Sequence, residues 1–314
     1  MKALQFSEYG PPEVLTVAEA PEPHAGPGQI RVAVKAASVN AADWKGRSGK
    51  FAGGKPLEGP RYLGFDAAGV VDEVGEGVTG VAVGDDVFGN GSKTQAEFAV
   101  LDSWAHKPPA IDWAVAAAVG VAGETGERVL RLLDVKAGDT LFIDGGAGGV
   151  GAVAAQIAVA RGARVIASAS QDNQDYLREI GVTPVLYGQG LVDRVRAAAQ
   201  DILGGDGPPE PPRRGVVDAV LDVAGKSPIE DLIRLAPDPS QVVSIANFGA
   251  SAAGARVTGG SADSQPMKAL AEAAELLQQN KLVVKVQTFP LERAAEAHRI
   301  IESGHIRGKL VLLP

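Results

Sequence analysis

The spacing of apolar and polar residues changes its period about one third of the way along the chain. Before about Ile111 the pattern is that of strands: "QIRVAVKAA" (Gln29–Ala37) alternates with the two-residue period of a half-buried strand. The stretch "GVVDEVGEGVTGVAVGDDVFG" interrupts valine-rich pieces with glycine and aspartate, which predicts further strands joined by tight turns. The Pro-rich "PEPHAGPG" is typical of an extended loop. The first third is therefore expected to be rich in β-structure.

After Ile111, segments with the strand period alternate with segments that have the helical period. Helices are predicted over Gly149–Arg161, near Tyr176–Ile180 and near Leu191–Ile202, and the strands around them are "TLFID", "ARVIASAS", "PVLYG", "VVDAVLDVAG", "QVVSIANFG" and "ARVTGG". Such alternation predicts a parallel sheet covered by helices on both faces.

Two segments fall outside this alternation. The Pro- and Gly-rich "GGDGPPEPPRRG" (Gly204–Gly215) is predicted to be a surface loop. The terminal "FPLERAAEAHRIIESGHIRGKLVLLP" predicts an amphipathic helix stopped by Gly304 and then a strand. No helix follows that strand, so we expect it to return to the sheet of the first domain.

Composition narrows the function classes. The 314 residues are enough for two domains, and 45% hydrophobic residues favour a sizeable core. The net charge of −8 disfavours a nucleic-acid surface. The sequence contains no cysteine, which excludes disulfides, thiolate nucleophiles and Cys-ligated zinc. With no signal-peptide h-region and no apolar run of about 20 residues, we expect a soluble cytoplasmic protein.

Three glycines follow the predicted strand "LFID" in the stretch "DGGAGGVG". Gly146, Gly148 and Gly151 form G-x-G-x-x-G between a strand and a helix, the context that the dinucleotide-binding fingerprint requires. We expect Gly146 to permit the tight turn, Gly148 to let a pyrophosphate approach the backbone, and Gly151 to let the helix pack on its strand. Free N–H groups at the start of that helix would bind the phosphates.

The end of the next strand, "IASASQDN", bears on the choice between NAD and NADP. NAD enzymes usually place an acid there to bind the ribose 2′-hydroxyl. Ser168 and Ser170 stand at those positions, and hydroxyls can donate to a 2′-phosphate, so NADP is favoured. Two observations keep NAD open: Asp172 could reach back to the ribose, and no Arg or Lys stands in this loop.

Five blocks in order resemble the medium-chain dehydrogenase/reductase superfamily, in its zinc-free quinone oxidoreductase (zeta-crystallin-like) branch. They are "ASVNAADWKGRSG", "LGFDAAGVVDEVGEGVTGVAVGDDVFG", "VAGETGERVLRLLDVKAGDTLFIDGGAGGVG", "VLDVAG" and "ESGHIRGKLVL". The resemblance implies a GroES-like β-rich substrate domain (residues 1–120 with 266–314), a Rossmann domain with a doubly wound parallel sheet (121–265), and an active site between them. It also implies NADPH-dependent reduction of quinones or α,β-unsaturated carbonyls, and a homodimer joined edge to edge near "ARVTGG".

The resemblance also assigns Asn40 and Thr125 as catalytic residues, and Tyr62 joins them as the only tyrosine expected near the cleft from the first domain. The cofactor-binding candidates come from the resemblance, the glycine motif and the ends of the predicted strands together. They are Asn40, Thr125, Gly146, Gly148, Gly149, Val150, Gly151, Ser168, Ser170, Asn173, Tyr187, Phe248 and Lys309.

Most of these candidates have a second interpretation. Asn40 could donate from its amide to a developing anion or only cap a loop, and Thr125 could contact nicotinamide or bond to its own helical turn. Tyr62 could donate a proton or form an aromatic wall, and Phe248 could shield nicotinamide or belong to the core. Asp43 and Lys45 could hold the loop or relay a proton, but a charged pair so close in the sequence is expected on a solvated face.

The chain lacks the residues that bind zinc in the zinc-dependent relatives. Asn40 and Asp43 occupy the region of their zinc-binding cysteine, Phe65 and Asp66 replace a His-Glu pair, and the four histidines (His24, His106, His298 and His305) are dispersed. We therefore expect no metal site. Glu124 stands where relatives usually carry an apolar residue, and Asn173 and Gln174 stand where some relatives carry a phosphate-binding Lys.

Two alternative functions stay open: an enoyl reductase of secondary metabolism and a non-catalytic nucleotide-binding protein of the same fold.

Overall fold

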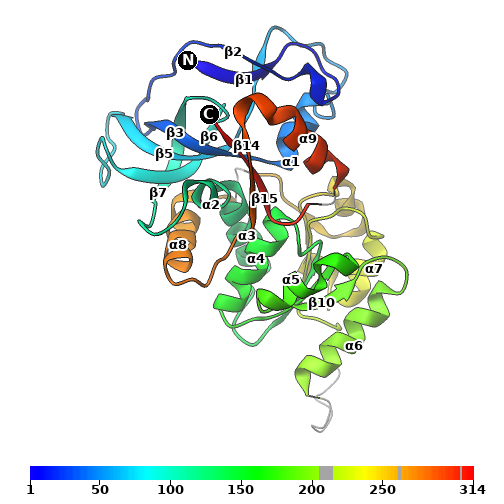
Figure 1. Ribbon diagram of the computed structural model, residues 1–314. Coiled ribbons are helices and arrows are strands. Elements are labelled where there is room, and N and C mark those ends of the chain that lie inside the picture. Colours follow the sequence, from blue (N-terminus) through cyan, green and yellow to red (C-terminus); the bar gives the residue numbers. More distant parts are fainter. Residues whose placement is uncertain (205–214, 261–262, 305) are drawn as a thin grey trace. The chain divides into compact units, whose positions relative to one another are not determined.

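The computed structural model describes residues 1–204, 215–260, 263–304 and 306–314 (Figure 1). The chain divides into two compact units. The first unit contains residues 1–124, 266–280 and 284–314, and the second contains residues 125–265 and 281–283. The first crossing between the units lies inside one helix, α3 (Gly120–Leu132), and not in a loop.

A six-stranded sheet organises the first unit. Its strands lie in the order β14 (Val286–Pro290), β15 (Lys309–Leu313), β3 (Ile30–Val39), β5 (Asp66–Val74), β6 (Asp86–Ser92) and β7 (Phe98–His106). Strand β7 also pairs with β3, so four of these strands close on themselves. Inward-facing residues of β3, β5, β6 and β7, such as Val32, Val71 and Leu101, form one apolar core. The alternation along Gln29–Ala37 predicted β3 correctly.

The last strand, β15, comes from the end of the chain and joins this sheet. It runs antiparallel to β3, with Leu310 opposite Val39, and parallel to β14. Helix α9 (Ala294–Ser303) precedes it and ends at Gly304, whose φ of +71° is the left-handed conformation expected at a helix C-terminus. The prediction that the terminal strand returns to the first domain's sheet is therefore confirmed.

The remaining elements of the first unit surround this sheet. A smaller sheet has the order β2 (Thr16–Glu19), β1 (Lys2–Phe6) and β4 (Arg61–Tyr62). The helices are α1 (Ala41–Arg47), α2 (Trp113–Ala117), the start of α3, α8 (Pro266–Gln278) and α9. Leu4 and Phe6 of β1 pack with Leu310 and Leu312 of β15 and with Leu291, which joins the two sheets through one apolar cluster.

The second unit is a parallel sheet with helices. Its strands lie in the order β10 (Thr183–Leu186), β9 (Arg164–Ala169), β8 (Thr140–Asp144), β11 (Ala219–Asp222), β12 (Val242–Ser244) and β13 (Arg256–Val257), and all five pairings are parallel. Numbered along the chain, this is the Rossmann order 3-2-1-4-5-6. The expected fold class, a GroES-like domain and a doubly wound Rossmann sheet, is therefore confirmed.

Helices α4 (Gly149–Ala160), α5 (Gln174–Glu179), α6 (Leu191–Leu203) and α7 (Ile229–Leu235) connect these strands. Phe142 of β8, Ile166 of β9 and Val220 of β11 lie on one face of the sheet and pack against α6 and α7. Leu141 and Ile143 alternate with Phe142 and therefore point to the opposite face, where α4 packs on β8 and β9. The strand-and-helix alternation predicted this unit well, although 205–214 of the predicted surface loop lie outside the described residues.

No helix among the described residues combines the length and the apolar character that crossing a bilayer requires.

Candidate functional site

The glycine-rich loop lies at the point where the strand order of the second unit reverses. Strand β8 has β9 on one side and β11 on the other, so the connections from β8 and from β11 run in opposite directions across the sheet. In doubly wound sheets, ligands bind outside the carboxyl ends of the strands at this switch point. The loop from Gly145 to Gly148 leaves β8 there and leads directly into α4.

Three glycines in this loop and in the first turn of α4 are required, one by its backbone conformation and two by close packing. Gly145 has a φ of +98°, so the positive-φ turn is there and not at Gly146 as expected. A Cβ on Gly146 would lie 2.4 Å from the Cβ of Ala167, and one on Gly151 would lie 2.3 Å from the carbonyl oxygen of Gly145. Gly146 thus fits under the neighbouring strand, and Gly151 allows the helix to contact the turn.

Gly148 differs from these three because a side chain would fit there. The nearest atom to its Cβ position is the Gly145 carbonyl oxygen at 3.8 Å, and its φ of −76° suits any residue. Its missing side chain leaves open space directly beside the first turn of α4. A diphosphate that binds main-chain N–H groups needs such an open approach.

The first turn of α4 supplies the donors. The N–H of Ala152 bonds to the carbonyl of Gly148 at 2.9 Å, which begins the helical pattern. The N–H groups of Gly149, Val150 and Gly151 precede it, and such groups have no acceptor within their own helix. Together with the positive end of the helix dipole they favour an anion. The loop therefore fits the diphosphate of a dinucleotide.

Four polar residues form a row across neighbouring strands beneath this loop. Ser168, Asp144, Asp222 and Ser244 are paired in register on β9, β8, β11 and β12. Ser168 donates to Asp144 at 2.5 Å and accepts the Gly145 N–H at 3.0 Å. Ser244 donates to Asp222 at 2.7 Å, and Asp222 accepts the Gly225 N–H at 2.7 Å. The hydroxyl of Ser168, expected to bind a phosphate, is thus used within the sheet to hold the start of the glycine loop.

Burial of this row affects its ionisation. Burial is the main cause that raises the pKa of Asp222, and the nearby Asp144 carboxyl adds to it. Asp144 is buried, and its second oxygen, Oδ2, has no hydrogen-bond partner. Two carboxyls therefore lie on adjacent strands beneath a loop suited to an anion.

The end of β9 is joined to the end of β10 by a buried glutamine. The side-chain amide of Gln174 donates to the carbonyl oxygens of Ala169, Ser170 and Val185 at 3.1–3.2 Å. Ser170 accepts from the Asn173 amide at 3.1 Å, and both side chains are partly exposed. Tyr187 follows β10 and is 55% exposed. The structure thus brings Ser170, Asn173 and the β10 end carrying Tyr187 to one edge of the sheet.

Thr125 and Phe248 lie elsewhere in the second unit. Thr125, in α3, accepts at 3.4 Å from Arg128, which also donates to Thr258 at 2.5 Å. Phe248 follows β12 at the carboxyl edge, is 52% exposed, and lies against Gly259. Its exposure excludes a place in the core, whereas its contact with nicotinamide stays a prediction.

In the first unit, the predicted site residues Asn40 and Lys309 form a buried polar cluster with Ser38 and Asp66. We call these four residues the Asn40 cluster. The register that pairs Leu310 with Val39 places Lys309 opposite Asn40, and Lys309 Nζ donates to Asn40 Oδ1 at 2.5 Å. The Asn40 amide nitrogen donates to Asp66 at 2.7 Å and to Ser38 at 3.3 Å. Asp66 also accepts from Ser38 at 2.6 Å and from the Val121 N–H at 2.8 Å.

Asp43 adds a second buried acid beside this cluster. Its carboxylate accepts the Asn40 N–H at 2.7 Å and the Gly64 N–H at 2.9 Å, which ties the start of α1 to the segment before β5. The expectation that Asp43 lies on a solvated face is wrong, because the side chain is fully buried. Burial raises its pKa to about 7, and Asp66 adds to the effect.

Lys309 is the cation that faces these acids. Burial lowers its pKa, while Asp66 and Asp43 oppose that effect. Its Nζ lies 4.0 Å from Asp66 Oδ2. Two carboxyls and one ammonium therefore share a site that excludes water, which favours a protonated Asp43 near neutral pH.

Tyr62 stands apart from the Asn40 cluster, on the small sheet. It pairs with Gln5 of β1, and Lys93 Nζ lies 5.6 Å from the centre of its ring. Lys45 of α1 is partly buried, which lowers its pKa. Neither side chain forms a hydrogen bond with Asn40 or Asp43.

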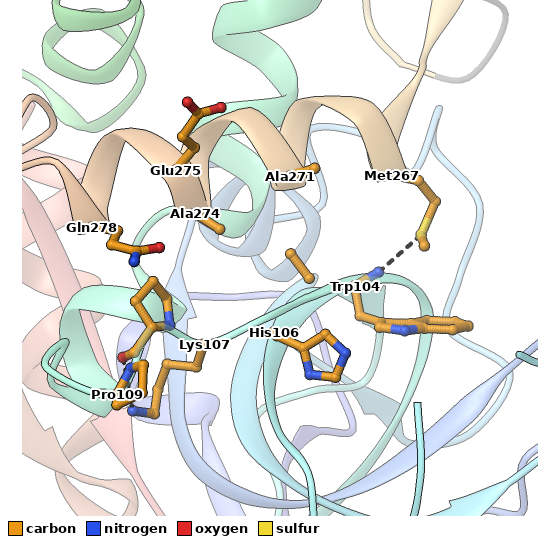
Figure 2. A pocket seen from close by; sticks show the side chains of 11 residues that line it. Trp104, His106, Lys107, Pro109, Met267, Ala271, Ala274, Glu275 and Gln278 are labelled. Carbon is orange, nitrogen blue, oxygen red and sulfur yellow. Dashed lines mark hydrogen bonds between the residues drawn. The ribbon is translucent and has the colours of Figure 1, made fainter. Parts of the chain in front are cut away.

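A hollow of about 490 Å³ lies between β7 and α8 (Figure 2). Trp104, His106 and Met267 line it, and the Trp104 N–H donates to the Met267 sulfur at 3.3 Å. None of the candidate residues lines this hollow, so it is not part of the candidate site. Within the described part of the chain, no three His, Asp or Glu side chains lie together as metal ligands.

Sequence reasoning missed several residues of the site. Asp144 and Asp222 each end a strand that is otherwise apolar, "LFID" and "AVLD", and a charged residue at such a position was a usable signal. Asp43 stands three residues after Asn40, the spacing of a helix capping box, which was a usable local signal. Asp66 carried no such signal, because its partners Ser38 and Val121 come from distant segments.

Two family models match the chain. Residues 26–130 match "Alcohol dehydrogenase GroES-like domain", and residues 198–312 match "Zinc-binding dehydrogenase".

Three curated proteins illustrate what the chain is similar to. A quinone oxidoreductase of Pseudomonas aeruginosa is 30% identical over 100% of this chain and 99% of its own length. The chloroplastic NADPH-dependent alkenal/one oxidoreductase of Arabidopsis thaliana is 29% identical over 100% of this chain and 80% of its own. The spectinabilin polyketide synthase system protein NorB of Streptomyces orinoci is 32% identical over 95% of this chain but only 14% of its own length.

A solved structure agrees with these matches. The quinone oxidoreductase of Escherichia coli complexed with NADPH superposes with a TM-score of 0.81 and 26% identity, and the match covers 100% of each chain. The chain is similar over its full length to quinone oxidoreductases, and it has their GroES-like and Rossmann units and a glycine loop. The chain therefore belongs to the medium-chain dehydrogenase/reductase superfamily, among its quinone oxidoreductases.

Proposed function

We propose that the protein is an NADPH-dependent, zinc-independent oxidoreductase that reduces quinones or α,β-unsaturated carbonyls by hydride transfer. The observation that carries the proposal is the cradle at the switch point of the Rossmann sheet: Gly148 leaves open space beside free N–H groups, and Gly146 and Gly151 close the turn around it. Relatives named as quinone and alkenal/one oxidoreductases support the reaction class.

Residues of the second unit would hold the coenzyme. Gly149, Val150 and Gly151 would donate main-chain N–H groups to the diphosphate, and Ser168 would keep Gly145 in place. Ser170, Asn173 and Tyr187, at the ends of β9 and β10, would contact the ribose and its 2′-phosphate. Thr125 and Phe248 would contact the nicotinamide, which when bound supplies the hydride.

In the first unit, Asn40 and Lys309 would serve the reduction. Lys309 fixes the amide of Asn40 by donating to its oxygen, so the two N–H groups of the amide face the opposite way. These two N–H groups donate to Ser38 at 3.3 Å and to Asp66 at 2.7 Å, so the N–H that faces Ser38 makes the weaker bond. Asn40 would donate that N–H to the oxygen that gains charge, because a fixed dipole stabilises a developing anion without reorganisation. Tyr62 would supply a proton or line the substrate.

Zinc independence is supported by the sequence, which contains no cysteine for the thiolate ligands of zinc. Elemental analysis of active protein, and assays with and without a chelator, measure this part of the proposal. Loss of activity on chelation would contradict it.

A coenzyme oxidation assay tests the reaction. Purified protein is mixed with NADPH or NADH and then with a quinone, an alkenal or an enoyl thioester, and the absorbance of the reduced coenzyme is followed. We expect turnover with NADPH and with the quinone or the alkenal. Binding of NADPH without turnover on any of these would contradict the enzymatic proposal and favour a nucleotide-binding protein of the same fold.

A second candidate function is the reduction of enoyl thioesters. The similarity of 95% of this chain to a segment of a polyketide synthase protein favours it. In the same assay, turnover confined to the enoyl thioester would replace the quinone and alkenal proposal with this one.

We also propose that two copies associate through β13. This strand of two residues ends the Rossmann sheet, and Val257 on it is 36% exposed. The open edge of a sheet can pair with the same edge of a second copy. Light scattering on a sizing column should give twice the mass of one chain, whereas the mass of a monomer would contradict the pairing.

A further inference from the structure

One arginine organises the loop between β10 and α6. Arg194, in the first turn of α6, turns back and donates to four main-chain carbonyls of that loop. Nε bonds to Leu186 at 2.9 Å, Nη1 to Gln189 at 2.9 Å, and Nη2 to Tyr187 and Gly188 at 3.2 Å each. Its guanidinium is therefore held at a fixed place beside Tyr187.

This place adjoins the ribose end of the expected nucleotide site. Strand β10 lies next to β9 and parallel to it, with Leu186 opposite Ala169. The Gln174 amide joins the two strand ends through Ser170 and Val185. In Rossmann sheets the residues at the end of the second strand contact the adenosine ribose. The loop that encloses Arg194 is the next one along the same edge.

Arg194 also differs from the other arginines near it in its charge balance. Arg178 pairs with Asp175 at 2.6 Å, and Arg196 pairs with Asp193 at 3.2 Å. No carboxylate of the described residues forms an ion pair with Arg194, whose bonds all go to neutral carbonyls. Of the five N–H groups of a guanidinium, these four bonds leave one on Nη1. A positive charge with a free donor thus lies at this edge.

We propose that Arg194 is the cationic group that recognises the 2′-phosphate of the coenzyme and so determines the preference for NADPH over NADH. The inference rests on the proposed function and names the residue that carries its coenzyme choice. It also explains how NADP can bind although the end of β9 carries no Lys or Arg. The positive charge would come from Arg194, on the connection that follows β10. Arginine suits a phosphate because its planar donors are fixed in direction and always charged.

Binding measurements without turnover test the inference. Titration calorimetry compares NADPH with NADH on the wild-type protein and on Arg194→Gln, Arg194→Lys and the control Arg196→Gln. Arg196 lies on the same helix, is exposed, and has its own acidic partner. We expect Arg194→Gln to weaken NADPH binding about tenfold to hundredfold while NADH binding changes little. Arg196→Gln should leave both affinities unchanged.

The lysine variant separates charge from loop geometry. Arg194→Lys keeps the charge but cannot make the four carbonyl bonds, so it should retain more of the NADPH preference than Arg194→Gln at low salt. The difference between wild type and Arg194→Gln should shrink as salt increases. Equal weakening of NADPH and NADH by Arg194→Gln would show a role in loop structure alone and overturn the inference.

The outcomes for the inference and for the proposed function are distinct. If the wild-type protein binds neither coenzyme, the proposed function fails. If it prefers NADPH and Arg194→Gln keeps that preference, only the inference fails. If it prefers NADH, Asp172 is the better candidate for the ribose and the inference is overturned.

Discussion

A Gly148→Ala variant should fold as stably as the wild-type protein and bind NADPH about tenfold to hundredfold more weakly. The added methyl group meets no atom nearer than 3.8 Å, and the backbone at this position, with φ −76° and ψ 172°, suits alanine. The methyl group would therefore cost the free protein little. It would occupy the open space beside the N–H groups of Gly149 and Val150, where the diphosphate must approach.

Gly151→Ala is the matched comparison and, unlike Gly148→Ala, should destabilise the free protein. Its methyl group would lie 2.3 Å from the Gly145 carbonyl oxygen and 3.0 Å from the Gly146 Cα, and both are backbone atoms. We expect the free energy of unfolding to fall by about 1–3 kcal/mol, because the helix must move away from the turn. Coenzyme binding should weaken as a consequence of that movement.

Thermal melts without ligand and calorimetric titrations with NADPH separate the two effects. Gly148→Ala should keep the melting temperature and lose affinity, whereas Gly151→Ala should lose both. If Gly148→Ala bound NADPH as tightly as the wild type does, the cradle would not hold the diphosphate, and the main support for the proposed function would disappear.

The second unit could be predicted from the sequence because its signals are local. A strand, a glycine loop and a helix follow one another between Thr140 and Ala160, and the period of the apolar residues defines each of them. The return of β15 to the first unit was also predictable, since no helix follows that strand. Two details differed: the positive-φ turn lies at Gly145 in place of Gly146, and the Ser168 hydroxyl bonds within the sheet.

The Asn40 cluster could not be predicted, because burial of a charge depends on partners that the local sequence does not show. Asp43 and Lys45 are close in the sequence, which suggested a solvated pair. Asp43 accepts the N–H of nearby Asn40, but its other partner, the Gly64 N–H, and the charges of Asp66 and Lys309 that act on its pKa come from distant segments. Arg194 escaped prediction for a related reason: it lies inside a helix, and only the folded loop places its guanidinium beside Tyr187.

Replacing Lys309 by methionine should have the largest effect on stability. The variant keeps the apolar part of the side chain but removes the only ammonium that the structure places beside Asp66 and Asp43 among the described residues. It also removes the donor to Asn40 Oδ1, which frees the amide to turn. Removing one partner of a buried ionic group typically costs about 3–5 kcal/mol, because the remaining charge stays buried. We expect a loss of this size in chemical unfolding at pH 8.

The loss should depend on pH in a defined direction. The folded-state pKa of Asp43 is raised from 3.8 to about 7, so its stabilising contribution is present below 3.8 and is lost as the pH rises through about 7. Without Lys309, which opposes this rise, the pKa of Asp43 would be higher still and the loss would continue to higher pH. The difference between wild type and variant should therefore be smaller at pH 5.5 than at pH 8.

A double-mutant cycle with Asp43→Asn assigns the effect to the acids. Asp43→Asn alone should destabilise the protein, because its amide nitrogen would face one of two N–H donors, those of Asn40 and Gly64. Together with Lys309→Met it should cost less than the sum of the single changes, since the pair no longer leaves an extra buried negative charge. Lys268→Met, at an exposed position of α8, is the control and should leave stability unchanged. Additive losses that do not vary between pH 5.5 and pH 8 would show that Lys309 acts through packing alone, and that the two acids are not balanced by its charge.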